Sequence, residues 1–405
     1  MRILVISNYY PPVAFGGYEA QCASVVEHLR SSHEVLVLTS TVGRRQVPLE
    51  SGVRRELPFL AGRTANPRVP FAAVRAARFT RRTLRSFAPD LAYVWNASHL
   101  PHVVLALLAQ AGVPIVYSVA DYSFSGLYRG DQFLKYLLEE RRGVAGLWGR
   151  VIRATNHFPA LQVDASTPRS VGVMWHSEAL RRLNAAPPML RPVIERVVYQ
   201  NSRQAAAFAD IERHPASSPT IALVGRISPE KGPDVAYRAL AALRDRHGIK
   251  ARLVLAGPAE RFMRRNLNML ARELRIQDQI ELRGPLATTA LGELLATAHA
   301  IVIPSVWEEP YGLICLEAAL ARVPIVAARS GGMPEILHEN VHALFFPIGD
   351  ADACAGALAA AFEQPEDTAA RTRRAFERAG SFDYLQYLTE SERFLEEARH
   401  ILLHA

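Results

Sequence analysis

Glu309 and Glu317, with seven residues between them, stand in the segment Pro304-Ser-Val-Trp-Glu-Glu-Pro-Tyr-Gly-Leu-Ile-Cys-Leu-Glu317. We predict that Glu309 precedes a helix that opens at Gly312, and that Glu317 lies inside this helix. At 1.5 Å of rise per residue the second carboxylate lies roughly 7 Å beyond the helix start, so the two cannot act on one atom. They can hold two ends of an extended ligand, while free N–H groups at residues 311–314 face an anion between them. A nucleotide sugar has this layout. A solvated helix start with acidic residues that suit the dipole is the alternative.

A pair of cations follows another predicted strand, in the segment Val224-Gly-Arg-Ile-Ser-Pro-Glu-Lys-Gly232. Arg226 and Lys231 are placed to neutralise a diphosphate from a loop at the strand end. The chain has 47 basic residues, of which Lys231 is one of only three lysines. In a chain so rich in arginine, a position that tolerates either cation would more often carry arginine. We therefore expect that Lys231 has a functional role. An exposed surface pair is the alternative interpretation.

Paired glycines stand after the first predicted strand, in the segment Tyr9-Tyr-Pro-Pro-Val-Ala-Phe-Gly-Gly-Tyr-Glu19. Gly16 and Gly17 precede a predicted helix, where they allow a ligand to approach the backbone closely. With Tyr18 they form the predicted phosphate or acceptor loop. Neither the GxGxxG fingerprint of dinucleotide sites nor a GxxxxGK[ST] loop occurs in the chain.

Short apolar runs alternate with longer helical patterns along nearly the whole chain. The runs are continuous rather than alternating, which is typical of strands buried on both faces of a parallel sheet. We therefore predict two βαβ arrays. The predicted strands are 2–7, 33–39, 91–95 and 114–119 in the first half, and 220–224, 251–256, 279–282, 300–303 and 324–327 in the second.

The length of 405 residues exceeds what one core supports, since cores stop growing near ~250–300 residues. The turn-rich segment 214–219 interrupts the alternation of predicted strands and helices. We therefore predict a first domain of residues 1–212 and a second of residues 213–381. The last helix, 382–405, is predicted to return to the first domain. In such open sheets a ligand sits at the carboxyl ends of the strands, which is where the three loops above lie.

The composition excludes several classes of protein. With 49% apolar and 21% charged residues the chain is not disordered. Its three cysteines include no CxxC pair, so a disulfide framework or a thiolate zinc site is not expected, and a reducing, cytoplasmic compartment fits. Met1-Arg2 leads straight into a strand, without the pattern of a signal peptide. The uncharged run from Pro101 to Ala120 is cut by Gly112-Val-Pro114, so we predict a helix, a turn and a strand rather than a membrane span.

Taken together, these motifs resemble a retaining glycosyltransferase of family 4, a family with the GT-B fold of two Rossmann-like α/β domains that face each other across a cleft. The resemblance spans essentially the whole chain. It rests on Pro11-Pro12 with Gly16-Gly17, Gly225-Arg226 with Lys231-Gly232, the two glutamates Glu309 and Glu317, Ser330-Gly-Gly-Met-Pro-Glu335, and the stretches 340–350 and 382–387.

This resemblance implies that Glu309 contacts sugar hydroxyls near the anomeric carbon and that Glu317 binds the ribose hydroxyls. Arg226 and Lys231 would stabilise the leaving diphosphate. The implied donor-binding set is completed by Gly225, Glu308, Tyr311, Gly312 and Leu313. The co-substrate would be a nucleotide-diphosphate sugar, with no cofactor and no metal.

The chain departs from the family at the segment Val119-Ala-Asp-Tyr122, where His-Asp is usual. Ala120 cannot hydrogen-bond to the donor sugar. Either Asp121 or Tyr122 takes over this role, or the sugar is held differently, which leaves the choice of sugar open. We include Asp121 in the predicted catalytic set. Two further departures are Arg322, where glycine is usual, and residues 200–202, where an Asn-Gly-x-Asp turn is usual.

Retention of configuration needs little acid–base machinery. If the nucleophile attacks from the side on which the diphosphate leaves, the departing phosphate oxygen can accept the acceptor's proton, and the protein supplies charge and orientation. Asp350-Ala-Asp352 imitates a metal-binding DxD motif, but we interpret it as a helix cap. Two other functions stay open: a sugar-nucleotide epimerase or hydrolase on this fold, and a non-catalytic module that binds nucleotide sugars.

Arginines concentrate in residues 41–90, where eleven of them face only three acidic residues. Part of this charge lies on the predicted helix 69–87. Three interpretations compete: peripheral contact with an anionic membrane at its inner face, a site for an anionic acceptor, and a merely solvated face. Nucleic acid is not an expected partner, because no aromatic stacking platform accompanies the charge. The acceptor itself is not readable from the sequence.

Overall fold

The computed structural model describes residues 1–13, 17–60, 69–126, 146–147 and 168–405. The chain forms two compact units, as its length predicted. The first unit contains Met1–Val198 and Tyr387–Ala405, and the second contains Tyr199–Gln386.

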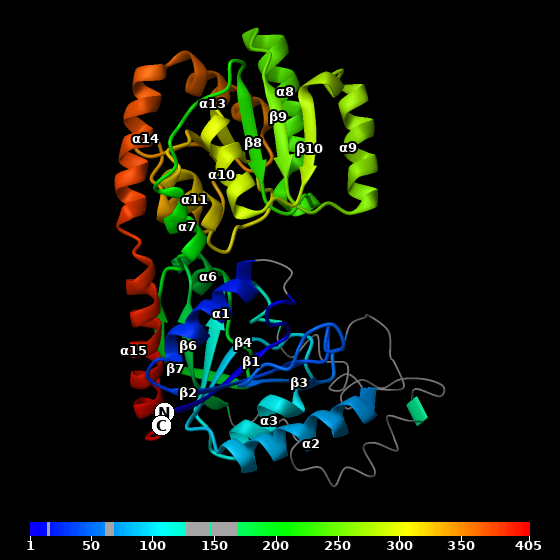
Figure 1. Ribbon diagram of the computed structural model, residues 1–405, viewed down its shortest axis with the longest axis vertical. Helices are drawn as coiled ribbons and strands as arrows, with labels where there is room; N and C mark the ends of the chain where they lie inside the picture. The colour runs from blue at the N-terminus through cyan, green and yellow to red at the C-terminus, as the bar shows by residue number, and fades with distance from the viewer. Residues whose placement is uncertain (14–16, 61–68, 127–145, 148–167) are drawn as a thin grey trace. The chain divides into compact units, whose positions relative to one another are not determined.

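The first unit is built on a seven-stranded sheet in the order β3-β2-β1-β4-β5-β6-β7, in which every neighbouring pair is parallel (Figure 1). The strands are β1 (Arg2–Ser7), β2 (Glu34–Ser40), β3 (Val53–Leu57), β4 (Leu91–Asn96), β5 (Ile115–Val119), β6 (Arg169–Trp175) and β7 (Leu190–Val197). The four strands predicted in this half are present, while β3, β6 and β7 were not predicted.

Helices cover both faces of this sheet. The described helices are α1 (Gly17–Leu29), α2 (Val69–Phe87), α3 (Val103–Gln110), α6 (Glu178–Leu183) and the end of α15 (Tyr384–Leu402). Leu4 and Ile6 of β1 share a core with α2 and α3, so Ile3 and Val5 point to the other face, where α1 lies. The run 101–120 folds as α3, a turn at Gly112 and β5, as predicted. Across the residues that the structure describes, no helix combines the length and the apolar character that crossing a membrane requires.

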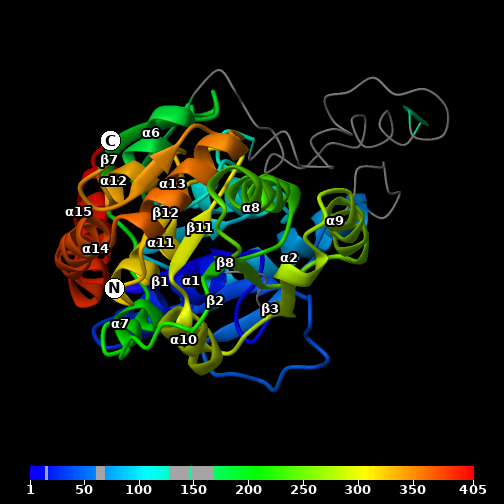
Figure 2. The same cartoon turned by 90° about the horizontal axis from the view of Figure 1, so that it is seen from above.

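The second unit has a six-stranded parallel sheet in the order β10-β9-β8-β11-β12-β13. Its strands are β8 (Thr220–Val224), β9 (Arg252–Ala256), β10 (Ile280–Gly284), β11 (Ala300–Ile303), β12 (Ile325–Ala328) and β13 (Leu344–Phe346). Its helices are α7 (Arg203–Phe208), α8 (Pro233–His247), α9 (Arg261–Glu273), α10 (Thr288–Thr297), α11 (Leu313–Leu320), α12 (Met333–Ile336), α13 (Ala351–Glu363) and α14 (Pro365–Gly380), with short 3₁₀ turns at Pro229–Lys231 and Gln277–Gln279. Helices α8 and α13 pack side by side (Figure 2).

The boundary between the units lies after Val198, not after residue 212 as predicted. Helix α7 packs on helix α11 of the second unit, so residues 199–212 belong to that unit. The turn-rich segment 214–219 only joins α7 to β8. A turn-rich segment shows only that the chain changes direction. The packing of α7 on α11 shows that α7 belongs to the core of the second unit.

Arg322, the departure from the usual glycine, stabilises this arrangement. It adopts a left-handed backbone conformation with φ of 53°. Its guanidinium lies 3.7 Å from the ring centroid of Phe376 on α14 and donates a 2.8 Å hydrogen bond to the carbonyl of Ala209 after α7. The arginine thus joins α7 and α14 at the end of α11, which offsets the strain of a non-glycine residue at positive φ.

The final helix passes from one unit to the other within its first turn. Phe382 stays with the second unit, where its carbonyl accepts a hydrogen bond from Asn201 and its ring packs on Tyr199. From Tyr387 onward the helix belongs to the first unit, where that ring lies 6.2 Å from the ring of His176. Burial lowers the pKa of His176 to about 4. The helix was predicted to join the first domain at residue 382, and it does so five residues later.

Glu392 anchors α15 to the first unit. Its carboxylate lies 2.8 Å from Nε2 of His28 and 3.0 Å from Nε2 of His33, and it accepts a hydrogen bond from Ser32. Partial burial would raise the pKa of Glu392, but the hydrogen bonds from Ser32 and His28 outweigh it and hold the pKa below the ordinary value. The carboxylate therefore binds these partners best in its ionised form.

We expect α15 to lose protection in acid. A depressed pKa contributes stability above the ordinary value, and this contribution is lost as the pH falls through the pKa of the folded state. Protection factors for Tyr387–Leu402 from hydrogen exchange, corrected for the intrinsic rate, should drop below about pH 4. In Glu392→Gln the same amides should already be less protected at pH 7. An unchanged profile in that variant would show that Glu392 does not hold the helix.

Candidate functional site

The loops that carry the predicted residues of the second unit meet at one edge of its sheet. Strands β8, β11 and β12 are neighbours, and they are followed by residues 225–232, 304–312 and 329–332. Because the strands are parallel, these loops lie at the same edge. The sheet order therefore gathers segments that are up to about a hundred residues apart in the sequence.

Glu309 and Lys231 form an ion pair at this edge, with 2.5 Å between Nζ and Oε1. Glu309 is only 4% exposed, and the same Oε1 accepts a hydrogen bond from Ser305. The Lys231 ammonium also lies 5.5 Å from the ring centroid of Trp307. The two residues predicted to handle the sugar and the diphosphate are thus in direct contact, although 78 positions separate them.

The backbone of Glu309 is held by the segment that follows β12. Its N–H donates to the hydroxyl of Ser330 at 2.8 Å, and its carbonyl accepts from the N–H of Gly332 at 2.8 Å. Gly331 has φ of 51°, and a Cβ there would lie 1.9 Å from the Glu309 carbonyl oxygen. Only glycine permits this approach, which explains the glycine at position 331. Glu308 is exposed and accepts a 2.5 Å hydrogen bond from the N–H of Gly331, so it orders the same segment.

The loop after β8 packs against the end of β11. A Cβ on Gly232, whose φ is 62°, would lie 2.0 Å from the carbonyl oxygen of Pro304. This close contact brings Lys231 to Glu309. Arg226 begins the same loop next to Gly225, but it is exposed and pairs with Glu230 at 3.0 Å. The structure therefore joins Lys231 to Glu309 and leaves Arg226 in a separate pair at the surface.

Helix α11 begins at Leu313, directly after Gly312, which caps it in a left-handed conformation. The first turn of a helix presents backbone N–H groups and the positive end of its dipole. Tyr311 is buried and its ring stacks at 6.0 Å on Tyr199, so this side chain packs inward and only its backbone faces the helix start.

Glu317 lies in the second turn of α11. Its carboxylate makes no hydrogen bond or ion pair with the part of the chain that the structure describes. Burial raises its pKa to about 7. A carboxylate without a partner that is partly withdrawn from water is suited to accept hydrogen bonds from a ligand, because the ligand would replace the hydration that it lost.

The first unit has a polar network at the carboxyl edge of its own sheet. Asn8 follows β1 and donates to Asn96 at the end of β4 at 2.7 Å, and Asn96 donates to Asp121 at 3.3 Å. The other oxygen of Asp121 accepts from the N–H and the hydroxyl of Ser123 at 2.8 and 2.5 Å. The carboxylate predicted to replace the family histidine thus also organises the turn after β5.

The glycine loop of the first unit is described in part. Gly16 lies outside the described residues, while Gly17 is the first residue of α1. The hydroxyl of Tyr18 lies within hydrogen-bond distance of the carbonyls of Ser118 and Trp95, at the ends of β5 and β4, and these two carbonyls share its one proton. Tyr18 therefore fixes the start of α1 to the sheet.

Several residues that shape the site were not singled out from the sequence. They are Ser305, Trp307 and Ser330 in the second unit, and Asn8 and Asn96 in the first. All five lie at a strand end or within a few residues of one, so their position after a predicted strand is the sequence signal that marks them. Asp350 caps α13 by accepting from the N–H of Ala353, which confirms the interpretation of the DxD sequence as a helix cap. Asp352 pairs with Arg246 at 2.9 Å.

A family model described as "Glycosyl transferases group 1" matches residues 206–379. A D-inositol 3-phosphate glycosyltransferase of Saccharomonospora viridis is 36% identical over 216 residues, which are 51% of this chain and 50% of the relative. The match thus spans half the length of that relative. A glycogen synthase of Mycobacterium tuberculosis is 28% identical over 411 residues, which cover 95% of this chain and 92% of the relative.

Solved structures match both units. The Anabaena protein HepE in complex with UDP-glucose has a TM-score of 0.68 at 20% identity, covering 98% of this chain and 100% of that chain. Sucrose-phosphate synthase from Thermosynechococcus elongatus has a TM-score of 0.70 at 16% identity, covering 98% of each chain. These likenesses show the fold, and they confirm the predicted class of two Rossmann-like α/β domains.

Proposed function

We propose that the protein moves a hexosyl unit from a nucleotide-diphosphate sugar to an acceptor with retention, and the proposal starts from the match of residues 206–379 to the group 1 glycosyl transferase model. The observation that carries the proposal is the ion pair of Lys231 with buried Glu309, beside the start of α11. A cation, a fixed carboxylate and a helix N-terminus suit a diphosphate that is attached to a hydroxyl-rich sugar.

Each donor-side group then has a distinct task. The Lys231 ammonium and the first turn of α11 compensate the charge that grows on the leaving diphosphate. Glu309, fixed by Ser305 and Ser330, accepts hydrogen bonds from sugar hydroxyls. Glu317 accepts hydrogen bonds from the ribose diol. The UDP-glucose complex of HepE supports a nucleotide-diphosphate donor for this chain.

Retention follows if the acceptor attacks from the side on which the diphosphate departs. The leaving phosphate oxygen then takes the acceptor's proton, so no side chain needs to serve as a general base. Lys231, the helix dipole and Arg226 supply the positive charge that this departure needs, and on this basis we propose a metal-independent reaction. Asp121 is proposed as the first-domain residue that acts near the sugar in place of the absent histidine.

The test is a transfer assay with a panel of nucleotide sugars and acceptors that includes D-inositol 3-phosphate and a glucan, because the relatives' names point to these. NMR of the product gives the anomeric configuration, and the expected product keeps that of the donor. The rate should be the same with EDTA and with added Mg²⁺. An inverted product would refute retention, and donor turnover without a glycosylated product would select the epimerase or hydrolase instead.

A further inference from the structure

Helix α2 turns a strongly basic face outward. One side of the helix packs inward on the rest of the first unit, and its buried residues include Ala73, Ala76, Thr80 and Thr83. The opposite side carries five arginines, which we call the arginine face: Arg75, Arg78, Arg81, Arg82 and Arg85, all exposed. Over these ten residues of rise the face extends roughly 15 Å along the helix.

The charges on this face are not balanced within the helix. Helix α2 contains no aspartate or glutamate. Among the described residues, none of Arg78, Arg81, Arg82 and Arg85 forms an ion pair. Arg54 of β3 donates to Thr83 and Ser86 at 3.2 and 3.3 Å, which adds a further guanidinium beside the face. Like charges three and four residues apart repel each other, so an anionic partner would relieve a cost that the free helix bears.

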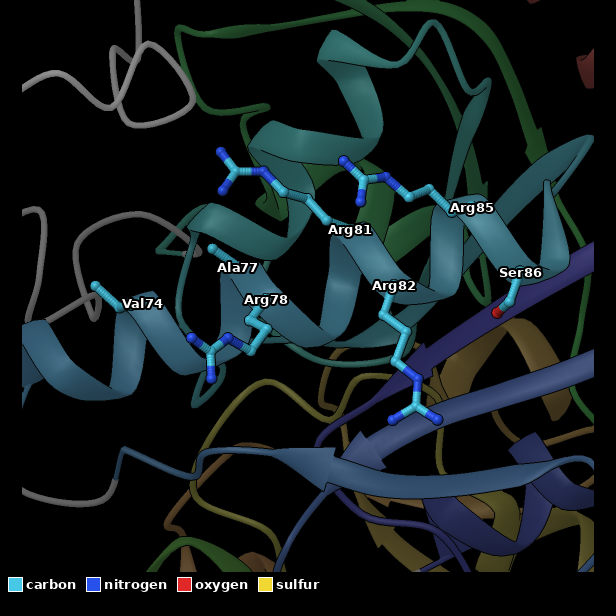
Figure 3. Close-up of a pocket in the computed structure, with 7 residues that line it drawn as sticks. All are labelled: Val74, Ala77, Arg78, Arg81, Arg82, Arg85 and Ser86. Atoms are coloured by element: carbon cyan, nitrogen blue, oxygen red, sulfur yellow. The ribbon is translucent and has the colours of Figure 1, made fainter.

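The guanidiniums diverge rather than converge. A hollow of about 540 Å³ is lined by Val74, Ala77, Arg78, Arg81, Arg82, Arg85 and Ser86. Arg78 and Arg82 project to one side of the helix, and Arg81 and Arg85 project to the other (Figure 3). A single phosphate would need these groups to point at one place. An extended layer of anions can contact them all at once.

The arginine face is also remote from the edge where sugar chemistry is expected. Helix α2 lies between the carboxyl end of β3 at Leu57 and the amino end of β4 at Leu91. It therefore runs from the carboxyl edge of the sheet to the amino edge, and Arg78–Arg85 lie in its second half. Ligands of such sheets bind at the carboxyl edge, so this topology argues against a subsite for an anionic acceptor.

We propose that the arginine face binds the surface of a membrane that contains anionic phospholipids. Phe71 is 67% exposed and Val74 is 47% exposed at the start of the same helix, so apolar side chains adjoin the cations. A helix that presents cations with exposed apolar residues, packed on a folded domain, suits the interface of an anionic bilayer. Nucleic acid fits less well, because the face has no row of aromatic rings on which bases could stack.

The proposal is tested by flotation of the full chain with vesicles. One set contains phosphatidylcholine alone, and the other also contains phosphatidylglycerol. Binding is expected only to the second set and should weaken steeply with salt, because exposed charges are screened. The triple variant Arg78→Ser, Arg81→Ser, Arg85→Ser should bind roughly a hundredfold more weakly, since each basic residue near the surface contributes about a fivefold gain in affinity.

The second unit offers a matched control. Arg261, Arg265 and Arg272 are exposed on α9, and changing all three to serine alters the net charge equally. This variant should float with the vesicles like the wild type, and both variants should unfold at the wild-type temperature. The proposal would be overturned by equal loss in the two variants, by binding to phosphatidylcholine alone, or by displacement with inorganic phosphate or an oligonucleotide that exceeds displacement by sodium chloride at the same ionic strength. Flotation requires no catalysis, so its outcome is independent of the proposed function.

Discussion

Replacing Lys231 by alanine is expected to lower kcat/KM for sugar transfer by about 10²–10³, because the leaving diphosphate loses its nearest cation. Lys231→Arg should restore only part of the rate, since a planar guanidinium cannot occupy the position of an ammonium 2.5 Å from Glu309 and 5.5 Å from the ring of Trp307. Steady-state kinetics with the donor found in the panel checks both variants. Wild-type rates in Lys231→Ala would remove this residue from the donor site.

The same substitution should also destabilise the protein, because the buried Glu309 carboxylate loses its counter-ion and keeps only the hydroxyl of Ser305 as a described partner. We expect a loss of about 1–3 kcal/mol in the free energy of unfolding, measured with denaturant. The double variant Lys231→Ala, Glu309→Gln tests whether the unpaired charge causes the loss of stability. Its stability should recover, because no unpaired charge remains, while its activity should stay low. Recovery of activity together with stability would show that Lys231 has only a structural task.

Glu317→Gln should change stability and ligand affinity in opposite directions. The pKa of Glu317 is raised to about 7, so the folded protein retains this proton while the unfolded chain releases it near the ordinary value of 4.5. Stability from this group is therefore complete below about pH 4.5 and is lost as the pH rises through 7. Above pH 7 the glutamine variant avoids a partly buried charge, and it should be more stable than the wild type by on the order of 1–2 kcal/mol.

Binding of nucleotide should show the reverse. On the proposed function the ribose diol donates hydrogen bonds to this carboxylate and favours its ionised form, so the affinity of the wild type should rise as the pH increases through 7. The variant should bind about 10–100-fold more weakly at pH 8 and show no such rise. Calorimetry with a set of nucleoside diphosphates, in buffers of different ionisation enthalpy, measures the affinity and the proton release together. A wild-type affinity independent of pH would contradict the role of Glu317.

Three of the strands that were not predicted, β3, β7 and β13, lie at sheet edges. Strand β3, Val-Arg-Arg-Glu-Leu, and strand β7, with Pro192 and three charged residues, lie at the two edges of the first sheet. An edge strand pairs on one side only and stays partly exposed, so it tolerates charges and shows no continuous apolar run. Strand β13 has three residues, which is too short for any periodic signal. Strands β1, β2, β4 and β5 were predicted because both of their faces are buried, whereas β6, which also lies inside the sheet, was missed.

The sequence by itself determined the two parallel sheets and the strand ends at which Lys231, Glu309 and Asp121 stand. A strand that is buried on both faces has an apolar residue at nearly every position, and such a run is visible in a short stretch of sequence. Only the tertiary structure decided that Lys231 contacts Glu309, that α7 belongs to the second unit, and that burial raises the pKa of Glu317. These properties arise from contacts between segments far apart in the chain, and the order of strands in the sheet selects those contacts.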